Sequence, residues 1–137
     1  MVAADVEERL SRLEAEAAIR DLCSAFCQAL DHRDESLFLS IWADDAEWLI
    51  GTELQRGTDE IRAAWKSSID SVKRSRHIAA NVLVTWHDDH ATARSELYGQ
   101  ATMADGSPNQ VIVTMDDELV KQGERWVIRR RVVDLPG

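Results

Sequence analysis

The first third of the chain has the hydrophobic pattern of a long amphipathic helix. Ala and Glu are abundant there, and no Pro interrupts the segment. The pattern predicts a helix from about Ala4 to His32, followed by a shorter helix from about Glu35 to Trp42 with Asp34 as its N-cap. The apolar positions, which recur with a period of about 3.6 residues, are Val6, Leu10, Leu13, Ala17, Ile19, Leu22, Cys23, Phe26, Cys27 and Leu30.

The middle of the chain alternates between short strands and one more helix. Asp45 to Ile50 and Glu53 to Arg56 read as strands on either side of a turn. Thr58 is the expected N-cap of a helix that has acidic residues in its first turn. The apolar stripe of this helix is formed by Ile61, Ala64, Trp65, Ser68, Ile69 and Val72.

After Lys73 the hydrophobic pattern changes to a period of two, which is typical of strands. Short loops between the strands predict an antiparallel meander. We therefore expect one α+β domain over residues 1–137, in which a curved antiparallel sheet wraps around the long N-terminal helix as a cone-shaped barrel and residues 1–9 are able to fray. The four predicted strands are Ser75–Trp86, Ala91–Met103, Gln110–Lys121 and Arg125–Leu135.

The composition narrows the range of partners. A formal net charge of −9 disfavours nucleic acid and anionic membranes, because both need a basic face. No apolar run is long enough for a membrane span, and the charged N-terminus does not resemble a signal peptide. Cys23 and Cys27 lie on one helix face and are expected to be core residues rather than a disulfide. These features predict a cytoplasmic location.

Several segments resemble a known family. The residues that carry the resemblance are Ala17–Leu22, Ala29–Asp31, Ser40–Trp48, Arg76–Asn81 and Gly123–Ile128. They are similar to the SnoaL-like branch of the nuclear transport factor two-like (cystatin-like) superfamily, close to hexachlorocyclohexane dehydrochlorinase, scytalone dehydratase and bile acid 7α-dehydratase. The resemblance covers residues 10 to 135 and implies the cone-shaped fold. It specifies the reaction less well, because one fold hosts many activities.

Asp31 and His77 are the main candidates for chemistry. Asp31 ends the predicted first helix and His77 begins the first long strand, so the two could meet inside the cone. A carboxylate bound to one imidazole nitrogen leaves the other nitrogen free as a base. The alternative is that Asp31 only caps a turn with His32 and Arg33 and that His77 is an ordinary strand residue. The resemblance implies that His77 is the base and Asp31 its partner.

Arg131 is the third catalytic candidate that the resemblance implies. Facing inward, it could stabilise an oxyanion or a departing halide, or it could simply be the structural partner of an acidic residue. An inward Arg131 would place Arg129 on the same face of the strand.

An apolar set of residues is predicted to form the pocket walls, and Trp48 aligns with a pocket tryptophan of the relatives. Such walls would suit a small apolar ring compound, although the same residues could simply fill the core. The predicted substrate-binding residues are Phe26, Cys27, Trp48, Val72, Ser95, Leu97, Val111, Val113 and Met115.

The chain also departs from its relatives. Phe26 stands where they have a lysine, and the only tyrosine, Tyr98, faces away from Ser95 and Leu97 by strand parity. Both dehydration and dehydrochlorination would therefore lack a usual assisting group. The segment His87–His90 reads as an exposed turn rather than a metal site, and there is no glycine-rich phosphate loop, so we expect no metal or cofactor.

These patterns favour a cofactor-independent lyase or isomerase acting on a small apolar ring compound. A non-catalytic ligand-binding module and the small subunit of a ring-hydroxylating dioxygenase are the alternatives. We also expect a homo-oligomer, which the resemblance suggests is a trimer or a dimer. The reason is that the outer sheet face is predicted to carry the apolar side chains of Ile78, Val82, Val84 and Trp86.

Overall fold

The computed structural model describes residues 2–135 and confirms the predicted α+β class. Three helices and six strands follow one another nearly as the hydrophobic pattern indicates. They are α1 (Val2–Asp31), α2 (Glu35–Ser40), β1 (Trp42–Ile50), β2 (Glu53–Arg56), α3 (Gly57–Asp70), β3 (Val72–Trp86), β4 (Ala91–Met103), β5 (Pro108–Gln122) and β6 (Arg125–Asp134).

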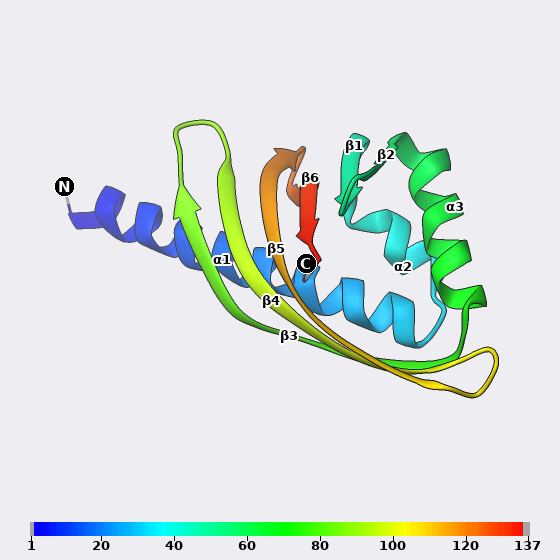
Figure 1. Cartoon of the computed structure of the whole chain (residues 1–137). Helices are drawn as coiled ribbons and strands as arrows, with labels where there is room; N and C mark the ends of the chain where they lie inside the picture. Colours follow the sequence, from blue (N-terminus) through cyan, green and yellow to red (C-terminus); the bar gives the residue numbers. More distant parts are fainter. Residues whose placement is uncertain (1, 136–137) are drawn as a thin grey trace.

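One curved sheet contains all six strands, in the order β2-β1-β6-β5-β4-β3. The predicted antiparallel meander from β3 to β6 is present. Two features differ from the prediction: β1 pairs with β6 in parallel, and the sheet stays open between its edge strands β2 and β3 rather than closing into a barrel. Helix α1 crosses one face of the sheet, with α2 and α3 at one end (Figure 1). Helices therefore cover the face of the sheet that would line the inside of a closed barrel.

A β-bulge bends β3 around α1. Asn81 has a φ of 57°, and the pairing with β4 shifts between Ala80 and Leu83. Asparagine tolerates this left-handed conformation better than most residues. Arg20 of α1 donates a hydrogen bond to the Val82 carbonyl, 3.3 Å away, and so ties the helix to the bulge.

Because of the bulge, the outer face of β3 carries different side chains than the sequence predicted. One extra residue exchanges the two faces of the strand beyond it. Ile78, before the bulge, is 62% exposed, as predicted. Beyond the bulge, Leu83 is 71% exposed, although its neighbours Val82 and Val84 were predicted to be the exposed residues. Val82, Val84 and Trp86 are only half-exposed, and the last two pack against the core.

Two helix starts were predicted, and the structure confirms one of them. The Asp34 carboxylate accepts a hydrogen bond from the Leu37 N–H, as expected of the N-cap of α2. Thr58 is not the N-cap of α3, because that helix begins two residues earlier than expected, with Arg56 in the capping position. The Arg56 side chain makes no capping hydrogen bond, but the Glu60 carboxylate accepts one from the Arg56 N–H.

Aromatic side chains fill the space between the helices and β1. Phe38 is fully buried at the centre of this cluster, with ring centroids 5.6 to 6.0 Å from its neighbours. The cluster consists of Phe26, Phe38, Trp42, Trp48 and Trp65. Cys23 and Cys27 are buried free thiols, as expected.

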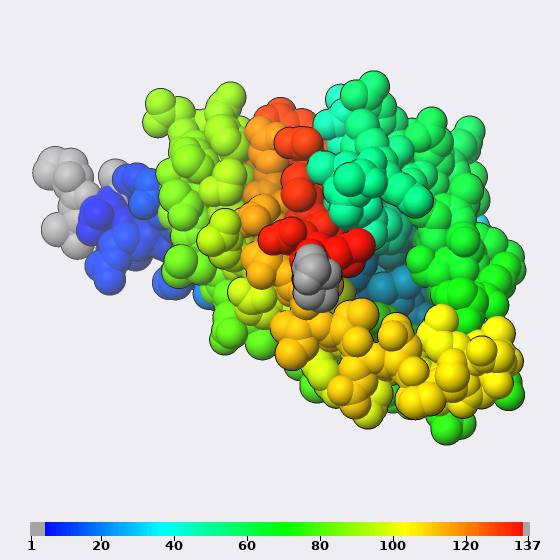
Figure 2. All heavy atoms as spheres, in the orientation of Figure 1, coloured from blue at the N-terminus to red at the C-terminus, as the bar shows by residue number. Residues whose placement is uncertain are grey.

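The N-terminal turns of α1 project beyond the sheet (Figures 1 and 2). Val6, Leu10 and Leu13 in this part of the helix are each more than half exposed. None of the helices in the described part of the chain has both the length and the apolar character that crossing a membrane requires.

Candidate functional site

The structure brings Asp31 and His77 into direct contact. The His77 ring Nδ1 lies 2.6 Å from Asp31 Oδ1, and the His77 backbone N–H donates to Asp31 Oδ2 at 2.8 Å. The Ser75 hydroxyl donates to Asp31 Oδ1 at 2.9 Å. The Asp31 side chain is 7% exposed and the His77 side chain 18%. Three donors thus hold this carboxylate in one orientation, well shielded from water.

The contact determines which imidazole nitrogen is available. An ionised carboxylate can only accept hydrogen bonds, so Nδ1 is the nitrogen that carries the proton. The other ring nitrogen, Nε2, is then left with a free lone pair. This is the arrangement that a general base requires.

Arg33 connects the helix that carries Asp31 to the strand that carries His77. Its guanidinium donates to the carbonyls of Ile69 and Val72, each at 2.8 Å, and so caps the end of α3 and the start of β3. Arg33 itself has a φ of 56°, in the turn just after α1. It therefore connects the end of the helix that carries Asp31 to the beginning of the strand that carries His77.

A cavity of about 220 Å³ opens beside His77, which lines it. More than half of the lining residues are apolar, and three serines and two amides are among the others. Among the described residues that line it, His77 is the only ionisable one. The lining comprises Leu30, Trp48, Ser68, Ile69, Ser71, Val72, Ser75, His77, Gly99, Gln100, Ala101, Met103, Asn109 and Val111.

Only part of the predicted wall lies on this cavity. Trp48, Val72 and Val111 line it. The remaining predicted residues are buried in the core and do not line it, because aromatic rings fill the narrow end of the cone. They are Phe26, Cys27, Ser95, Leu97, Val113 and Met115.

Arg131 faces inward but does not reach the cavity. It is fully buried and forms a two-bonded ion pair with Asp117, with both N···O distances at 2.7 Å. Its guanidinium carbon lies 4.6 Å from the centre of the Phe26 ring. Burial alone would lower the pKa of Arg131, but the Asp117 carboxylate more than offsets this and raises it. The arginine is therefore charged and already has an acidic partner.

Sequence reasoning missed Asp117, although a signal for it exists. Asp117 continues the inward-facing alternation of Val113 and Met115 along β5, and an acid in such a row needs a buried partner. Arg129 was expected to lie on the same face of the strand as Arg131, but it does not. The pairing of β5 with β6 shifts between Glu118 and Leu119, which leaves Arg129 bonded to Glu118 near the surface.

Trp48 lines the cavity, but its indole nitrogen is buried. The residue is 4% exposed, and its indole N–H has no hydrogen-bond partner within the described part of the chain. A buried donor without a partner costs about 1–3 kcal/mol. Tyr98, by contrast, lies on the outer face as expected, opposite Ile78 and Ile112 in the sheet.

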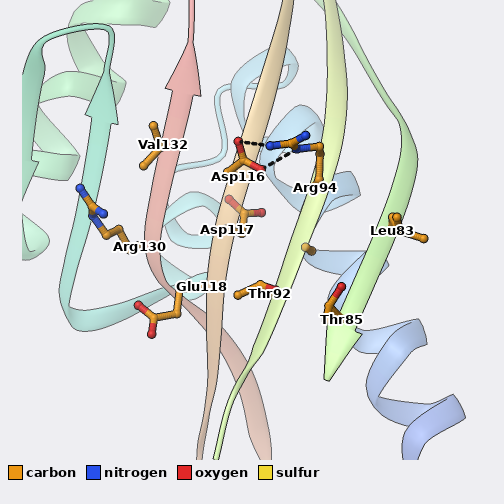
Figure 3. Close-up of a pocket in the computed structure, with 10 residues that line it drawn as sticks. Leu83, Thr85, Thr92, Arg94, Asp116, Asp117, Glu118, Arg130 and Val132 are labelled. Atoms are coloured by element: carbon orange, nitrogen blue, oxygen red, sulfur yellow. Dashed lines mark hydrogen bonds and ion pairs between the residues drawn. The ribbon is translucent and has the colours of Figure 1, made fainter. Parts of the chain in front are cut away.

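A larger hollow on the outer sheet face is a weaker candidate for chemistry. It measures about 470 Å³ and lies between Leu83 and Val132 (Figure 3). The acids and bases around it are already paired, as Figure 3 shows for Arg94 and Asp116, whose Nε and Oδ1 are 2.8 Å apart. It contains no histidine among the described residues that line it.

The His87–His90 turn is exposed, as predicted, and its two imidazole rings stack 4.6 Å apart. Across residues 2–135, no three His, Cys, Asp or Glu side chains are grouped so that they could hold a metal ion.

A family model described as a SnoaL-like domain matches residues 11–132. The chain belongs to this family. The match spans most of the chain and confirms the branch that the sequence resembles.

Solved structures with the same fold include two hexachlorocyclohexane dehydrochlorinases. The SnoaL-like chain superimposes on the LinA type 2 enzyme with a TM-score of 0.88 and 21% identity, covering 94% of this chain and 90% of that one. It matches LinA type 3 from Novosphingobium barchaimii with a TM-score of 0.86 and 20% identity, covering 94% and 91%. A scytalone dehydratase candidate from Novosphingobium aromaticivorans gives a TM-score of 0.85 and 16% identity, covering 92% and 87%. These likenesses show the cystatin-like fold.

A local sequence match points to the same group of enzymes. The γ-hexachlorocyclohexane dehydrochlorinase of Sphingobium indicum is 54% identical over 41 residues, which is 30% of this chain. The match covers about a quarter of the length of that relative, 26%.

Proposed function

We propose that this SnoaL-like protein is a cofactor-independent lyase in which His77 acts as the general base and Asp31 as its partner. The observation that supports it is the hydrogen-bonded pair, with Nδ1 and Oδ1 2.6 Å apart, at the wall of an apolar cavity. Asp31 orients the ring and stabilises the imidazolium that forms when Nε2 accepts a proton. Base catalysis of this kind contributes about 10²–10⁴-fold to a rate.

The reaction is an elimination across two adjacent carbons. A C–H bond breaks and its proton moves to His77 Nε2. The electron pair of that bond forms a carbon–carbon double bond, and the leaving group departs from the neighbouring carbon with its own bonding pair. Return of the proton to a different carbon, without loss of a leaving group, would make the same site an isomerase.

The cavity favours a leaving group that is stable as an anion. No described acid other than the protonated His77 lines it, so a hydroxyl group would have to receive its proton from His77 itself. A halide needs no such proton, and the dehydrochlorinase relatives support this choice.

The substrate that we propose is a small, mostly apolar molecule with a single ring. A cavity of about 220 Å³ is smaller than the roughly 300–1,000 Å³ of sites for drug-sized ligands. Its walls, including Trp48 and Val111, are more apolar than polar, and Gln100 and Asn109 contribute amide groups to them. A mostly apolar ring that carries a polar substituent matches this lining.

Arg131 receives a supporting role in this proposal. Its charge is paired with Asp117, and Phe26, over which it stacks, packs edge-on against Trp48 at 5.8 Å. Arg131 therefore fixes the wall that carries Trp48, and a direct contact with substrate is not required of it.

Turnover of defined probes tests the proposal. Hexachlorocyclohexane is the first probe, with halide release as the readout, and a cyclic alcohol is the second. We expect His77→Ala and Asp31→Asn to lower kcat/KM by about 10²–10⁴-fold. His87→Ala, which removes an exposed histidine of the β3–β4 turn, is the matched control and should retain the full rate. Equal turnover in all four proteins would refute the proposal.

A non-catalytic binding module predicts a different result from the same proteins. Probes would bind and be recovered intact, and His77→Ala would leave their affinity nearly unchanged. A dioxygenase small subunit would instead copurify stably with a larger protein and turn over neither probe alone.

We also propose that the protein self-associates through its outer sheet face, as a dimer or trimer, and resides in the cytoplasm. Ile78, Tyr98 and Ile112 form one row across β3, β4 and β5, and both isoleucines are more than 60% exposed. The two free, buried cysteines agree with a reducing compartment.

A further inference from the structure

Gly99 lies directly beneath the imidazole of His77. The two residues are cross-strand partners on β3 and β4, and both line the cavity. A Cβ atom built on Gly99 would be 2.9 Å from His77 Cδ2 and 3.1 Å from Nε2. Side chains do not approach one another this closely, so the ring can occupy its position only because residue 99 has no side chain.

The backbone at Gly99 gives no other reason for a glycine. Its φ is not among the positive values that the structure records at Gly51, Gly57, Gly106 and Gly123. Glycine in the interior of a strand is unfavourable, and it often marks a place where another group comes close. Here the group that comes close is the imidazole.

The imidazole cannot yield to a new methyl group. Its Nδ1 is bound to Asp31, and the backbone N–H of the same residue is bound to the other oxygen of that carboxylate. Rotation that moved Cδ2 and Nε2 away from residue 99 would also move Nδ1 and break the 2.6 Å contact. The Asp31 side chain is itself held by Ser75 and is nearly buried.

We infer that Gly99 is a positioning residue, whose missing side chain allows the His77 ring to lie flat against β4 while it is bonded to Asp31. This inference rests on the proposed function only for its effect on rate. Its effect on the position of the ring is independent of any reaction. A methyl group at residue 99 displaces the ring and leaves the strand otherwise intact.

The direct test observes the His77 ring by NMR in the full-length, ¹⁵N-labelled protein. The chain has four histidines, and the signal of the Nδ1–H bonded to Asp31 is assigned by its loss in His77→Gln and in Asp31→Asn. We expect Gly99→Ala to lose this signal or shift it strongly. Ala80→Ser is the control, because it also adds one heavy atom, at an exposed position of β3 that does not line the cavity. It should leave the signal in place.

The contact of the new methyl group with Val111 must be separated from its contact with His77. The same Cβ would lie 3.2 Å from Val111 Cγ2. If Gly99→Ala acts through His77, removing the valine branches in Gly99→Ala/Val111→Ala should not restore the signal. Restoration in that double variant would overturn the inference, as would an unchanged signal in Gly99→Ala alone.

A thermodynamic cycle keeps the test decisive if Gly99→Ala is too unstable for NMR. The change in urea midpoint caused by Gly99→Ala is measured with His77 present and again in a His77→Ala background. We expect a clear loss with His77 present and a much smaller one without it, since only the contact with Val111 then remains. Equal losses in the two backgrounds would contradict the inference.

The rate effect distinguishes this inference from the proposed function. If both hold, Gly99→Ala lowers kcat by at least tenfold, and Ala80→Ser, at an exposed position of β3 outside the cavity lining, does not. A displaced ring in a protein for which neither probe is a substrate would support the positioning role of Gly99 and count against the lyase.

Discussion

At the scale of single residues, the position of Asp31 at the end of α1 allows its carboxylate to accept hydrogen bonds from β3. Side chains on β3 and the backbone of that strand supply all three of its hydrogen bonds. The same carboxylate also lies near the Cys27 thiol, one helical turn earlier. Burial chiefly, and then the charge of Asp31, raise the pKa of Cys27 to about 11.

The raised thiol pKa predicts low cysteine reactivity in the folded protein. Thiolate is the reactive form, and at about pH 8 only about a thousandth of Cys27 would be ionised, against roughly a tenth for a thiol with the ordinary value of 9.0. We expect neither Cys27 nor the equally buried Cys23 to be alkylated by iodoacetamide until urea unfolds the chain. Mass spectrometry of the labelled protein measures this, and rapid labelling of the native state would contradict it.

The buried ion pair predicts an asymmetric effect on stability. Replacing one partner leaves an uncompensated charge, so Arg131→Met or Asp117→Leu should each lower the free energy of unfolding by about 3–5 kcal/mol. The double variant should recover much of this loss, because two apolar side chains leave no charge buried. Urea unfolding curves of the three variants test the pair. Additive losses would show that the two side chains do not act together.

At the scale of elements, two β-bulges explain why side chains of β3 and β6 point to a different face of the sheet than the sequence predicted. Period-two alternation predicts strand limits well, and β4 agrees with its prediction at both ends. Parity fails where one residue is inserted, at Asn81 in β3 and near Arg129 in β6. A bulge depends on how the strand curves around α1, which the alternation alone does not encode.

The site was predictable to a similar extent. The hydrophobic period located the end of α1 and the start of β3, and the resemblance to the SnoaL-like family singled out Asp31 and His77 there. Which inward residues line a cavity depends instead on the volume of their neighbours, and for that reason Leu97 and Met115 are core while Trp48 lines the cavity.

The bulge in β3 predicts a position-specific preference for glycine. The φ of 57° at Asn81 costs a residue with a Cβ about 1–2 kcal/mol, which asparagine partly recovers by local hydrogen bonding. Asn81→Ala should therefore lower the free energy of unfolding only by the part that asparagine recovers, which is less than about 1–2 kcal/mol, and Asn81→Gly, which avoids the penalty, by less still. Thermal and urea unfolding measure both. A greater loss for glycine than for alanine would contradict this account of the bend.

Arg33 predicts a local effect at the corner between α3 and β3. Removing two hydrogen bonds from a charged donor should lower the free energy of unfolding by about 1–3 kcal/mol. Hydrogen exchange in Arg33→Ala should speed up around residues 69–77. Arg62→Ala is the control, because its ion pairs with Glu35 and Asp59 are exposed and contribute about 0–1 kcal/mol. Equal effects of the two substitutions would show that Arg33 does not hold the corner.

At the scale of the whole molecule, the open sheet leaves one broad face without a cover. The helices occupy the other face, and the row formed by Ile78, Tyr98 and Ile112 lies on the uncovered one. We expect the protein to sediment as a dimer or trimer and Ile78→Glu/Ile112→Glu to sediment as a folded monomer. Leu13→Glu, on the projecting part of α1, should leave the assembly intact. Dissociation by Leu13→Glu alone would place the interface on the helix instead.

The whole fold also contributes to the surroundings of the proposed base. Residues of α1, α3, β1, β3, β4 and β5 line the cavity beside His77, whose side chain is only 18% exposed. The central claim is that Nε2 of His77 removes a proton from carbon.

Competition between a chlorinated cyclohexane and its ring-deuterated form tests this claim most directly. If His77 breaks a C–H bond, the unreacted probe should become enriched in deuterium with the native protein, and His77→Gln should consume neither form. Equal consumption of both forms, at a rate that His77→Gln retains, would contradict the account.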